Sequence, residues 1–164
     1  MENENSLTVY ALTEVHKYIA PAIYSGAGVC SPDEFVELEN VSPDDYRVRW
    51  KKALWDTGAT QSCISDRLAE ELGLEVDGFV DVATAMGIVR LSVYTIHLVL
   101  PSRLVFNSIQ AIGFTYGDDD CDLIIGMDIM TQGDLSLTNM EGRTVFSFRI
   151  PSLHVVDFEA EHSR

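Results

Sequence analysis

The sequence is poor in basic residues and has no long hydrophobic run, and each shortage excludes a class of protein. Its 164 residues include 11 lysines and arginines against 26 acidic residues, which gives a formal net charge of −15. Nucleic-acid backbones and anionic lipid surfaces would repel such a chain, so we expect neither as a partner. No apolar run approaches the roughly 20 residues that span a bilayer. The polar, acidic start at residues 1–6 also lacks the parts of a secretory signal. We therefore expect a soluble, cytoplasmic protein.

Cysteine and histidine are few and scattered. The three cysteines, Cys30, Cys63 and Cys121, form neither a disulfide framework nor a CxxC pair, and no two of the four histidines have the i, i+4 spacing of metal ligands. We expect reduced thiols, no metal site and no cofactor. A thiol nucleophile at Cys63 with His97 as its base matches no local motif, so Cys63 is interpreted as a small core residue.

Three aspartates at alternate positions, Asp118, Asp120 and Asp122, resemble the opening of a calcium loop. Such a loop also needs glycine at its sixth position and glutamate at its twelfth, where this chain has Leu123 and Ile129. The triplet is therefore interpreted as a solvated acidic turn before a buried strand.

Strand patterns dominate the rest of the chain. Tyr46, Val48 and Trp50 alternate with basic residues, which is typical of a half-buried strand, and the basic face is interpreted as one that discourages edge pairing. Two β-rich arms in residues 79–100 surround a reversal at Gly87 and predict a long hairpin. Further short strands are predicted in residues 104–114, 121–125 and 143–150.

Helix signals are weaker and local. Ser65 or Asp66 is the predicted cap of a short helix that ends at Gly73, and residues 126–133 have room for one helical turn or two. Ser31-Pro32-Asp33-Glu34 has the order of a helix start. We divide the chain into an N-terminal extension of unknown role (1–44), one domain (45–151) and a C-terminal tail (152–164).

Asp56 differs from the other acids because it directly follows an apolar strand. A carboxylate beside Leu54 and Trp55 is costly unless it is hydrogen-bonded, paired or protonated. Asp-Thr-Gly alone is an ordinary turn sequence, but here a helix and a glycine-tipped hairpin follow it. About seventy residues later comes an apolar strand closed by glycine, Ile124-Ile125-Gly126.

Together these segments resemble the retropepsin-like aspartic proteases, specifically the single-domain bacterial and gag-polyprotein-type branch. The resemblance rests on "WDTGATQSCISDRLAEELGL", "ATAMG", and "CDLIIGMDIMTQGDLSLTN" followed by "TVFSFRIPS", and it covers about two thirds of the chain. It implies a mainly β fold: an acid-protease β-barrel with one or two short helices in residues 45–151, active as a two-fold homodimer. The alternation of "TVFSFRI" suits a strand of an intersubunit sheet.

The family resemblance implies aspartic endopeptidase activity. Two Asp56 carboxylates, one from each copy, would form a dyad in which one acts as base toward water and the other donates to the scissile carbonyl. Thr57 would hydrogen-bond across the two-fold axis, and Gly58 would keep the approach to the carboxylates clear. Ala59 lacks the hydroxyl of a serine, so we expect the dyad to lose its proton at higher pH than in serine-bearing relatives.

Two further groups of residues take roles from the same resemblance. Ala85, Met86 and Gly87 would be the flap that closes over an extended peptide substrate. Ile124, Ile125 and Gly126 would support the site structurally.

Two other interpretations stay open. The chain could be a non-catalytic, dimeric peptide-binding or assembly module that keeps the protease fold. Alternatively, residues 1–44 could be a regulatory segment that occupies the groove or must be cleaved. The intact Asp-Thr-Gly favours the enzyme, because a binding module does not need a paired, strained acid.

Overall fold

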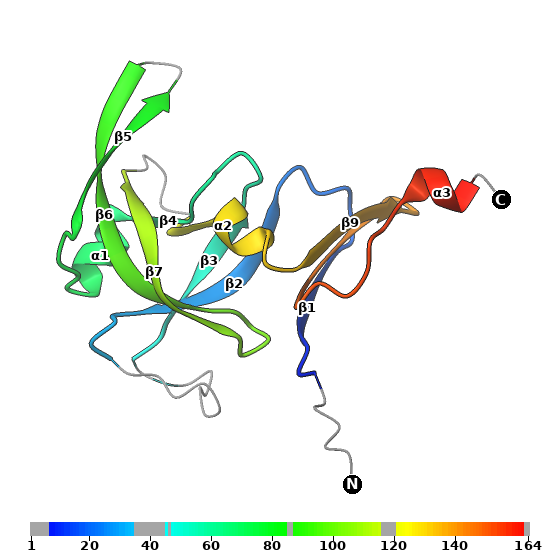
Figure 1. Cartoon of the computed structure of the whole chain (residues 1–164), viewed down its shortest axis with the longest axis horizontal. Helices are drawn as coiled ribbons and strands as arrows, with labels where there is room; N and C mark the ends of the chain where they lie inside the picture. The colour runs from blue at the N-terminus through cyan, green and yellow to red at the C-terminus, as the bar shows by residue number, and fades with distance from the viewer. Residues whose placement is uncertain (1–6, 35–44, 46, 85–86, 116–120, 163–164) are drawn as a thin grey trace, which may run out of the picture.

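Most of the chain is β-strand, arranged in two sheets (Figure 1). The computed structural model describes residues 7–34, 45, 47–84, 87–115 and 121–162. Seven strands form the larger sheet in the order β2-β3-β8-β4-β7-β6-β5, and three form the smaller sheet in the order β1-β10-β9. The strands are β1 Tyr10–His16, β2 Ile23–Cys30, β3 Arg49–Trp55, β4 Cys63–Ser65, β5 Gly78–Thr84, β6 Gly87–Val99, β7 Val105–Phe114, β8 Leu123–Ile125, β9 Asp134–Met140 and β10 Arg143–Ile150. The mainly β prediction is confirmed.

The larger sheet closes into a barrel through β2. This strand pairs antiparallel with β3 on one side and with the end of β6 on the other. Two parallel pairings, β3 with β8 and β4 with β7, bring segments far apart in the sequence together. Full closure leaves β5 as an added strand outside the ring, paired with β6 alone among the described strands.

Residues 10–30 belong to this hydrogen-bonded framework, although the sequence indicated no strand there. β2 supplies fully buried Ala27 and Val29 to the barrel, and β1 is paired along its length with β10. The described part of residues 1–44 therefore forms strands of both sheets, and deleting it would remove a barrel strand. Ser31–Glu34 forms a turn in which the Glu34 amide donates to the Ser31 carbonyl. Any helix continuing from it falls in residues 35–44, outside the described part.

The basic strand, β3, is a central strand of the larger sheet and not an edge strand. β3 lies between β2 and β8, so its basic face has no edge to protect. Lys51 and Arg49 instead approach Glu71, at 3.0 and 3.6 Å. The expectation that this face discourages edge pairing was wrong, because β3 has a neighbour on both sides; its partly exposed basic side chains contact a helix instead.

The described residues include three short helices: α1 Asp66–Glu71, α2 Met127–Met130 and α3 Phe158–His162. The Ser65 hydroxyl caps α1 by accepting from the Leu68 amide, and Gly73 follows the helix at a φ of 63°. Both ends of the predicted helix are thus confirmed, as is the single turn of α2. The sequence missed α3. None of the helices in the described residues is long and apolar enough to cross a membrane.

The smaller sheet is fixed to the barrel by an aromatic cluster. The Trp55 ring at the end of β3 lies 4.8 Å from the Phe146 ring and 5.0 Å from the Phe148 ring, both on β10. The Trp55 indole N–H also donates to the Ser25 hydroxyl on β2. β10 matches its predicted range but is the central strand of its sheet. Both of its edges are paired within the chain, with β1 and β9, and the intersubunit sheet stays a prediction.

Candidate active site

Asp56 begins the loop between β3 and β4, called here the Asp56 loop (residues 56–62). Its amide donates to the Ile125 carbonyl at 3.0 Å, which continues the parallel pairing of β3 with β8. The Asp56 side chain is half-buried. The carboxylate therefore sits at the end of two adjacent parallel strands and remains open to a ligand or to another molecule.

The next three residues position this carboxylate. The Gly58 amide donates to Asp56 Oδ1 at 2.8 Å. A Cβ at Gly58 would lie 3.1 Å from that same oxygen, so the absence of a side chain keeps the carboxylate accessible. The Ala59 amide donates to the Asp56 backbone carbonyl, which closes the turn. Thr57 is exposed beside it.

Gly126 allows β8 and α2 to pack directly against the Asp56 loop. A Cβ at Gly126 would lie 2.6 Å from the Gln61 carbonyl carbon and 2.9 Å from the Ser62 amide nitrogen, closer than real Cβ contacts occur. The Met127 amide donates to the Ala59 carbonyl at 2.8 Å, and the Asp128 amide donates to the Thr60 carbonyl. The apolar strand ending in glycine thus braces the loop that carries Asp56.

Ser62 and Asp128 complete this brace, and sequence reasoning missed both. The buried Ser62 hydroxyl donates to Asp128 Oδ1 at 2.8 Å and accepts from the Gly126 amide at 3.1 Å. One hydroxyl therefore joins the loop to the first turn of α2. The two residues are 66 positions apart, so no local pattern shows the contact. A sequence signal that could have indicated Asp128 is its position two residues after Gly126.

Cys63 and His97 are not arranged as a nucleophile and base. Cys63 is level with Ile112 on β7, which pairs with Val93, four residues along β6 from His97. That offset is roughly 13 Å at the usual rise of a strand. Burial, followed by the charges of Asp128 and Asp56, raises the pKa of the Cys63 thiol to about 11. Since a thiolate is the reactive form, this group is inert at neutral pH.

The predicted hairpin is formed by β5 and β6. Gly87 begins β6 at a φ of 121°, a conformation that favours glycine. Figure 1 shows the hairpin extending beyond the barrel. Phe79 and Ile88 on its two strands are largely exposed. Ala85 and Met86, the other predicted flap residues, lie outside the described residues.

Asp122 is not part of a solvated turn, which corrects that interpretation. It is 7% exposed and accepts hydrogen bonds at Oδ1 from the Ser65 hydroxyl at 2.7 Å and from Arg67 at 2.9 Å. Burial alone would raise its pKa, but these bonds outweigh burial and hold the pKa below its ordinary value of 3.8. Asp118 and Asp120 lie outside the described residues. Nowhere in the described ranges do three or more His, Cys, Asp or Glu side chains form a group that could hold a metal ion.

The candidate site is thus a half-buried Asp56 in an Asp-Thr-Gly turn, at the end of two paired parallel strands and supported by the strand that ends at Gly126. Residues 49–132 match the family described as "gag-polyprotein putative aspartyl protease". The chain belongs to this family, which confirms the predicted resemblance. A comparison with curated proteins found no match.

Two solved structures are similar to this chain. A retropepsin-like aspartic protease from Rickettsia conorii shares 15% identity at a TM-score of 0.48, with 87% of this chain and 96% of that chain covered. The retroviral protease-like domain of Ddi1 from Leishmania major shares 21% identity at a TM-score of 0.37, with 67% and 90% covered.

Proposed function

We propose that this chain is a homodimeric aspartic endopeptidase that hydrolyses peptide bonds with a water activated between two Asp56 carboxylates. The observation that carries the proposal is the half-buried Asp56 carboxylate, held by the Gly58 amide in a braced turn. One chain supplies one such turn, so the dyad requires a second copy related by a two-fold axis.

The chemistry follows from placing two carboxylates close together. Two such groups about 3 Å apart cannot both ionise, so the pair shares one proton. The ionised Asp56 takes a proton from water as the water oxygen attacks the scissile carbonyl carbon. The protonated Asp56 gives its proton to the carbonyl oxygen. The Asp56 that took the proton from water then gives it to the amide nitrogen, and the carbon–nitrogen bond breaks. The other Asp56 regains its proton from a hydroxyl of the tetrahedral intermediate, so the dyad again holds one proton.

The surroundings of Asp56 support these roles. The Gly58 amide donates a hydrogen bond to Asp56 Oδ1 and so holds the carboxylate in one orientation. The missing Cβ at Gly58 leaves room for water and for a peptide carbonyl. An extended peptide would lie between the Asp56 loop and the β5–β6 hairpin, with Ala85, Met86 and Gly87 at the hairpin tip closing over it. Thr57 would join the two loops across the axis.

Asp56→Asn tests the proposal, with Asp77→Asn as a matched control at an exposed position outside the site. We expect Asp56→Asn to remain folded and dimeric and to lose peptide cleavage by several orders of magnitude, since each acid–base role carries roughly 10²–10⁴-fold. Asp77→Asn should cleave like the wild type. Cleavage of a peptide library across pH 4 to 7, with and without a statine-type transition-state mimic, provides the measurement.

Two results would contradict the proposal. Wild-type cleavage by Asp56→Asn would mean that this carboxylate is not catalytic. A wild-type dimer that binds peptides and the mimic but cuts no peptide at any of these pH values would identify the chain as the non-catalytic binding module.

A further inference from the structure

Trp55, the residue directly before the candidate catalytic aspartate, is held by side chains from both ends of the chain. Its ring lies 4.8 Å from the Phe146 ring and 5.0 Å from the Phe148 ring, tilted by 53° and 55°. Its indole N–H donates to the Ser25 hydroxyl at 2.9 Å, and that hydroxyl donates in turn to the next backbone carbonyl of β2. Trp55 is therefore fixed by two ring contacts and by one directed hydrogen bond.

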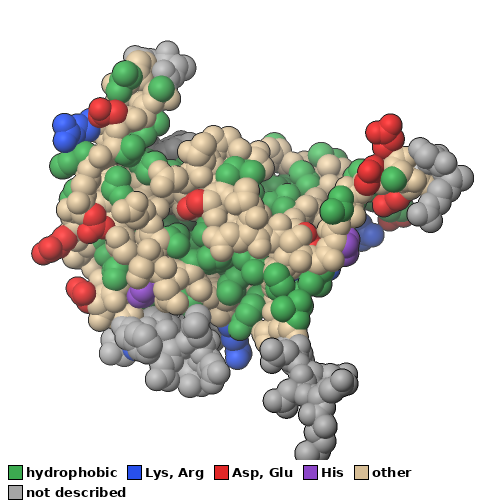
Figure 2. All heavy atoms as spheres, in the orientation of Figure 1, with side chains coloured by type: hydrophobic (Ala, Val, Ile, Leu, Met, Phe, Trp, Pro, Cys, Tyr) green, Lys and Arg blue, Asp and Glu red, His purple; other side chains and the backbone are tan. Residues whose placement is uncertain are grey.

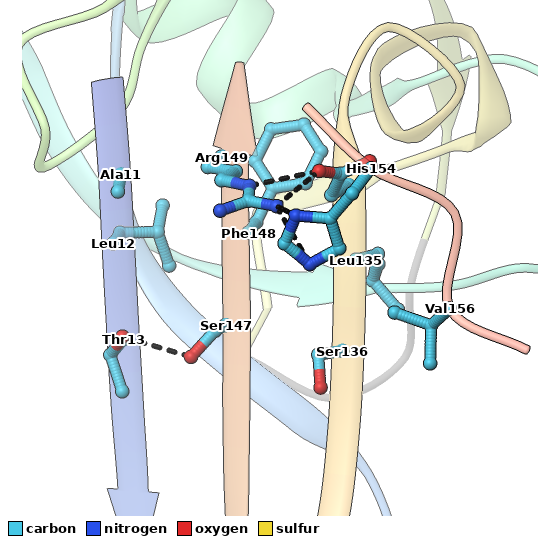
Figure 3. Close-up of a pocket in the computed structure, with 11 residues that line it drawn as sticks. Ala11, Leu12, Thr13, Leu135, Ser136, Ser147, Phe148, Arg149, His154 and Val156 are labelled. Carbon is cyan, nitrogen blue, oxygen red and sulfur yellow. Dashed lines mark hydrogen bonds and ion pairs between the residues drawn. The ribbon is translucent and has the colours of Figure 1, made fainter. Parts of the chain in front are cut away.

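These contacts are enclosed in the hydrophobic core. Trp55 is 7% exposed, Ser25 is 5% exposed and both phenylalanines are 2% exposed. Phe148 lies between Leu12 of β1 and Leu135 of β9, its opposite residues on the two sides of β10 (Figure 3). Figure 2 shows hydrophobic side chains gathered in the region of β1 and β9. Because close-packed side chains cannot turn without displacing their neighbours, the two sheets together determine where the Trp55 ring lies.

Fixing the Trp55 ring also fixes the direction of the Asp56 carboxylate. Successive side chains of a strand point to opposite faces, so rotating the end of β3 about its axis would turn both side chains together. Trp55 is buried and Asp56 is half-buried, in agreement with this alternation. The backbone at Trp55 is paired with Ile23 on β2 and with Ile125 on β8. These pairings hold the strand end in place, and the buried ring holds it against rotation.

A second contact connects β10 to the Asp56 loop through α2. Gly133, which follows α2, packs so closely on β10 that a Cβ there would lie 2.0 Å from the Arg149 carbonyl oxygen. The first two amides of α2 donate to the Ala59 and Thr60 carbonyls of the loop. β10 therefore supports the candidate site on both sides of Asp56, before it through Trp55 and after it through α2.

The side chains that hold Trp55 lie outside the part of the chain that matches the family. That match covers residues 49–132, whereas Ser25 belongs to β2 and Phe146 and Phe148 belong to β10. Trp55 itself lies inside the matched range, directly beside Asp56. Strands outside the matched range thus reach the candidate site through one side chain within it.

We propose that Trp55 is a positioning residue through which β2 and β10 set the direction of the Asp56 carboxylate. The effect on cleavage rests on the proposed function. The Trp55 ring faces the core and does not touch the reacting atoms, so its loss acts only through Asp56. β2 and β10 are then required for cleavage as well as for folding.

Phe146→Leu tests the proposal, with Phe106→Leu as the matched control. Both phenylalanines are buried, at 2% and 8% exposure, but in the described residues Phe106 on β7 has no ring contact with Trp55. Both variants should be less stable than the wild type, because each shrinks a core side chain. At a temperature where both stay folded, Phe146→Leu should lower kcat roughly ten- to hundredfold with KM changed less than about twofold. Phe106→Leu should keep kcat within about twofold of the wild type.

The hydrogen bond is tested separately by Trp55→Phe, Ser25→Ala and the double variant. Trp55→Phe keeps a ring beside the phenylalanines but has no N–H to donate, and Ser25→Ala removes the acceptor. We expect each single variant to lower kcat, and the double variant to lower it no further than Trp55→Phe does alone. Full addition of the two single effects would overturn the role of this hydrogen bond.

The Gly58 amide provides a readout that does not depend on cleavage. It donates to Asp56 Oδ1 at 2.8 Å, so its proton chemical shift reports where the carboxylate lies. In amide proton–nitrogen NMR spectra of the full chain, we expect the Gly58 resonance to move in Phe146→Leu and in Ser25→Ala. It should keep its wild-type position in Phe106→Leu. Ser25→Ala removes no ring, so a shift in that variant is not a ring-current effect, and it keeps the test decisive if Phe146→Leu does not fold.

The outcomes separate this inference from the proposed function. Wild-type kcat and an unmoved Gly58 resonance in folded Phe146→Leu and Ser25→Ala would overturn the role of Trp55 while the protease stands. A wild type that cuts no peptide, with a Gly58 resonance that moves in these variants, would confirm that Trp55 positions Asp56 and exclude the protease.

Discussion

At the scale of single residues, glycine and serine determine how Asp56 is presented. Gly58 leaves its carboxylate accessible, Gly126 lets β8 approach the Asp56 loop, and the Ser62 hydroxyl connects loop and helix. None of these groups would touch the reacting atoms except through Asp56. Their effect is to fix one carboxylate at the end of a strand pair.

Gly126→Ala tests the close approach. The added Cβ would meet backbone atoms of Gln61 and Ser62 at 2.6 to 2.9 Å, so the Asp56 loop must shift. We expect a loss of unfolding free energy of about 1–3 kcal/mol, typical of overpacking, and a larger proportional loss of cleavage than of folded protein. Chemical unfolding and the peptide assay measure the two effects.

Gly26→Ala is the control for this substitution, because no atom lies within 4 Å of a Cβ built there. It should change the unfolding free energy by no more than about 0.5 kcal/mol. An equally small effect of Gly126→Ala would show that the loop is not tightly packed against β8.

At the scale of secondary-structure elements, Asp122 joins α1 to β8. Its Oδ1 accepts from the Ser65 hydroxyl, which in turn accepts from the Leu68 amide at the start of the helix. Its backbone carbonyl accepts from the Ser65 amide. Lys51 on β3 lies 3.9 Å away. One buried carboxylate therefore holds a helix start against a central strand of the barrel.

The stabilisation from Asp122 should depend on pH. Its pKa is lower in the folded chain than the ordinary 3.8, so the unfolded chain takes up the proton first as pH falls. The contribution is complete well above pH 4 and is lost as pH falls through the folded-state pKa. Urea unfolding of wild type and Asp122→Asn at one protein concentration, at pH 7 and pH 3, measures this.

We expect the difference in unfolding free energy between wild type and Asp122→Asn to be clearly smaller at pH 3 than at pH 7. Asp77→Asn, at an exposed position, should show no such trend. A difference that is the same at both pH values would mean that the Asp122 carboxylate is not stabilised in its ionised form.

Elements with local signals could be predicted from the sequence, and those that depend on distant partners could not. Ser65 and Gly73 bound α1 through contacts within a few residues, so the helix was found. β2 was missed because Gly26 and Gly28 suggest a break. At Gly28 the glycine is needed for packing, since a Cβ there would lie 2.4 Å from Val48 Cγ1.

Some residues of the candidate site and its surroundings could likewise be recognised from local sequence, whereas others depend on distant partners. Asp56 and Gly126 belong to short motifs that can be recognised in the sequence. Asp122 looked like part of an acidic turn because its partner Ser65 is 57 positions away. For β10, the alternation of apolar residues gave the face that packs on Trp55 but carried no information about its neighbours on either side.

At the scale of the whole molecule, the net charge would oppose the association of two copies. Each chain carries a formal charge of −15, so two chains repel each other. The range of that repulsion is about 30 Å at 0.01 M salt and about 10 Å at 0.1 M. We expect the dimer dissociation constant to fall when sodium chloride is raised from 0.01 to 0.15 M at pH 7.

Sedimentation at the two salt concentrations tests this expectation, and cleavage per protomer should rise in parallel. The opposite trend, a dimer weakened by salt, would indicate that attractive ion pairs hold the two copies together.

The pairing of β1 with β10 also has a consequence for synthesis. Tyr10 lies opposite Ile150 in the antiparallel pairing of β1 with β10, so two strands separated by most of the chain must meet before the smaller sheet exists. Closing such a long loop is slow compared with forming local hairpins. A nascent chain from which residues 143–150 have not yet emerged therefore cannot form the smaller sheet.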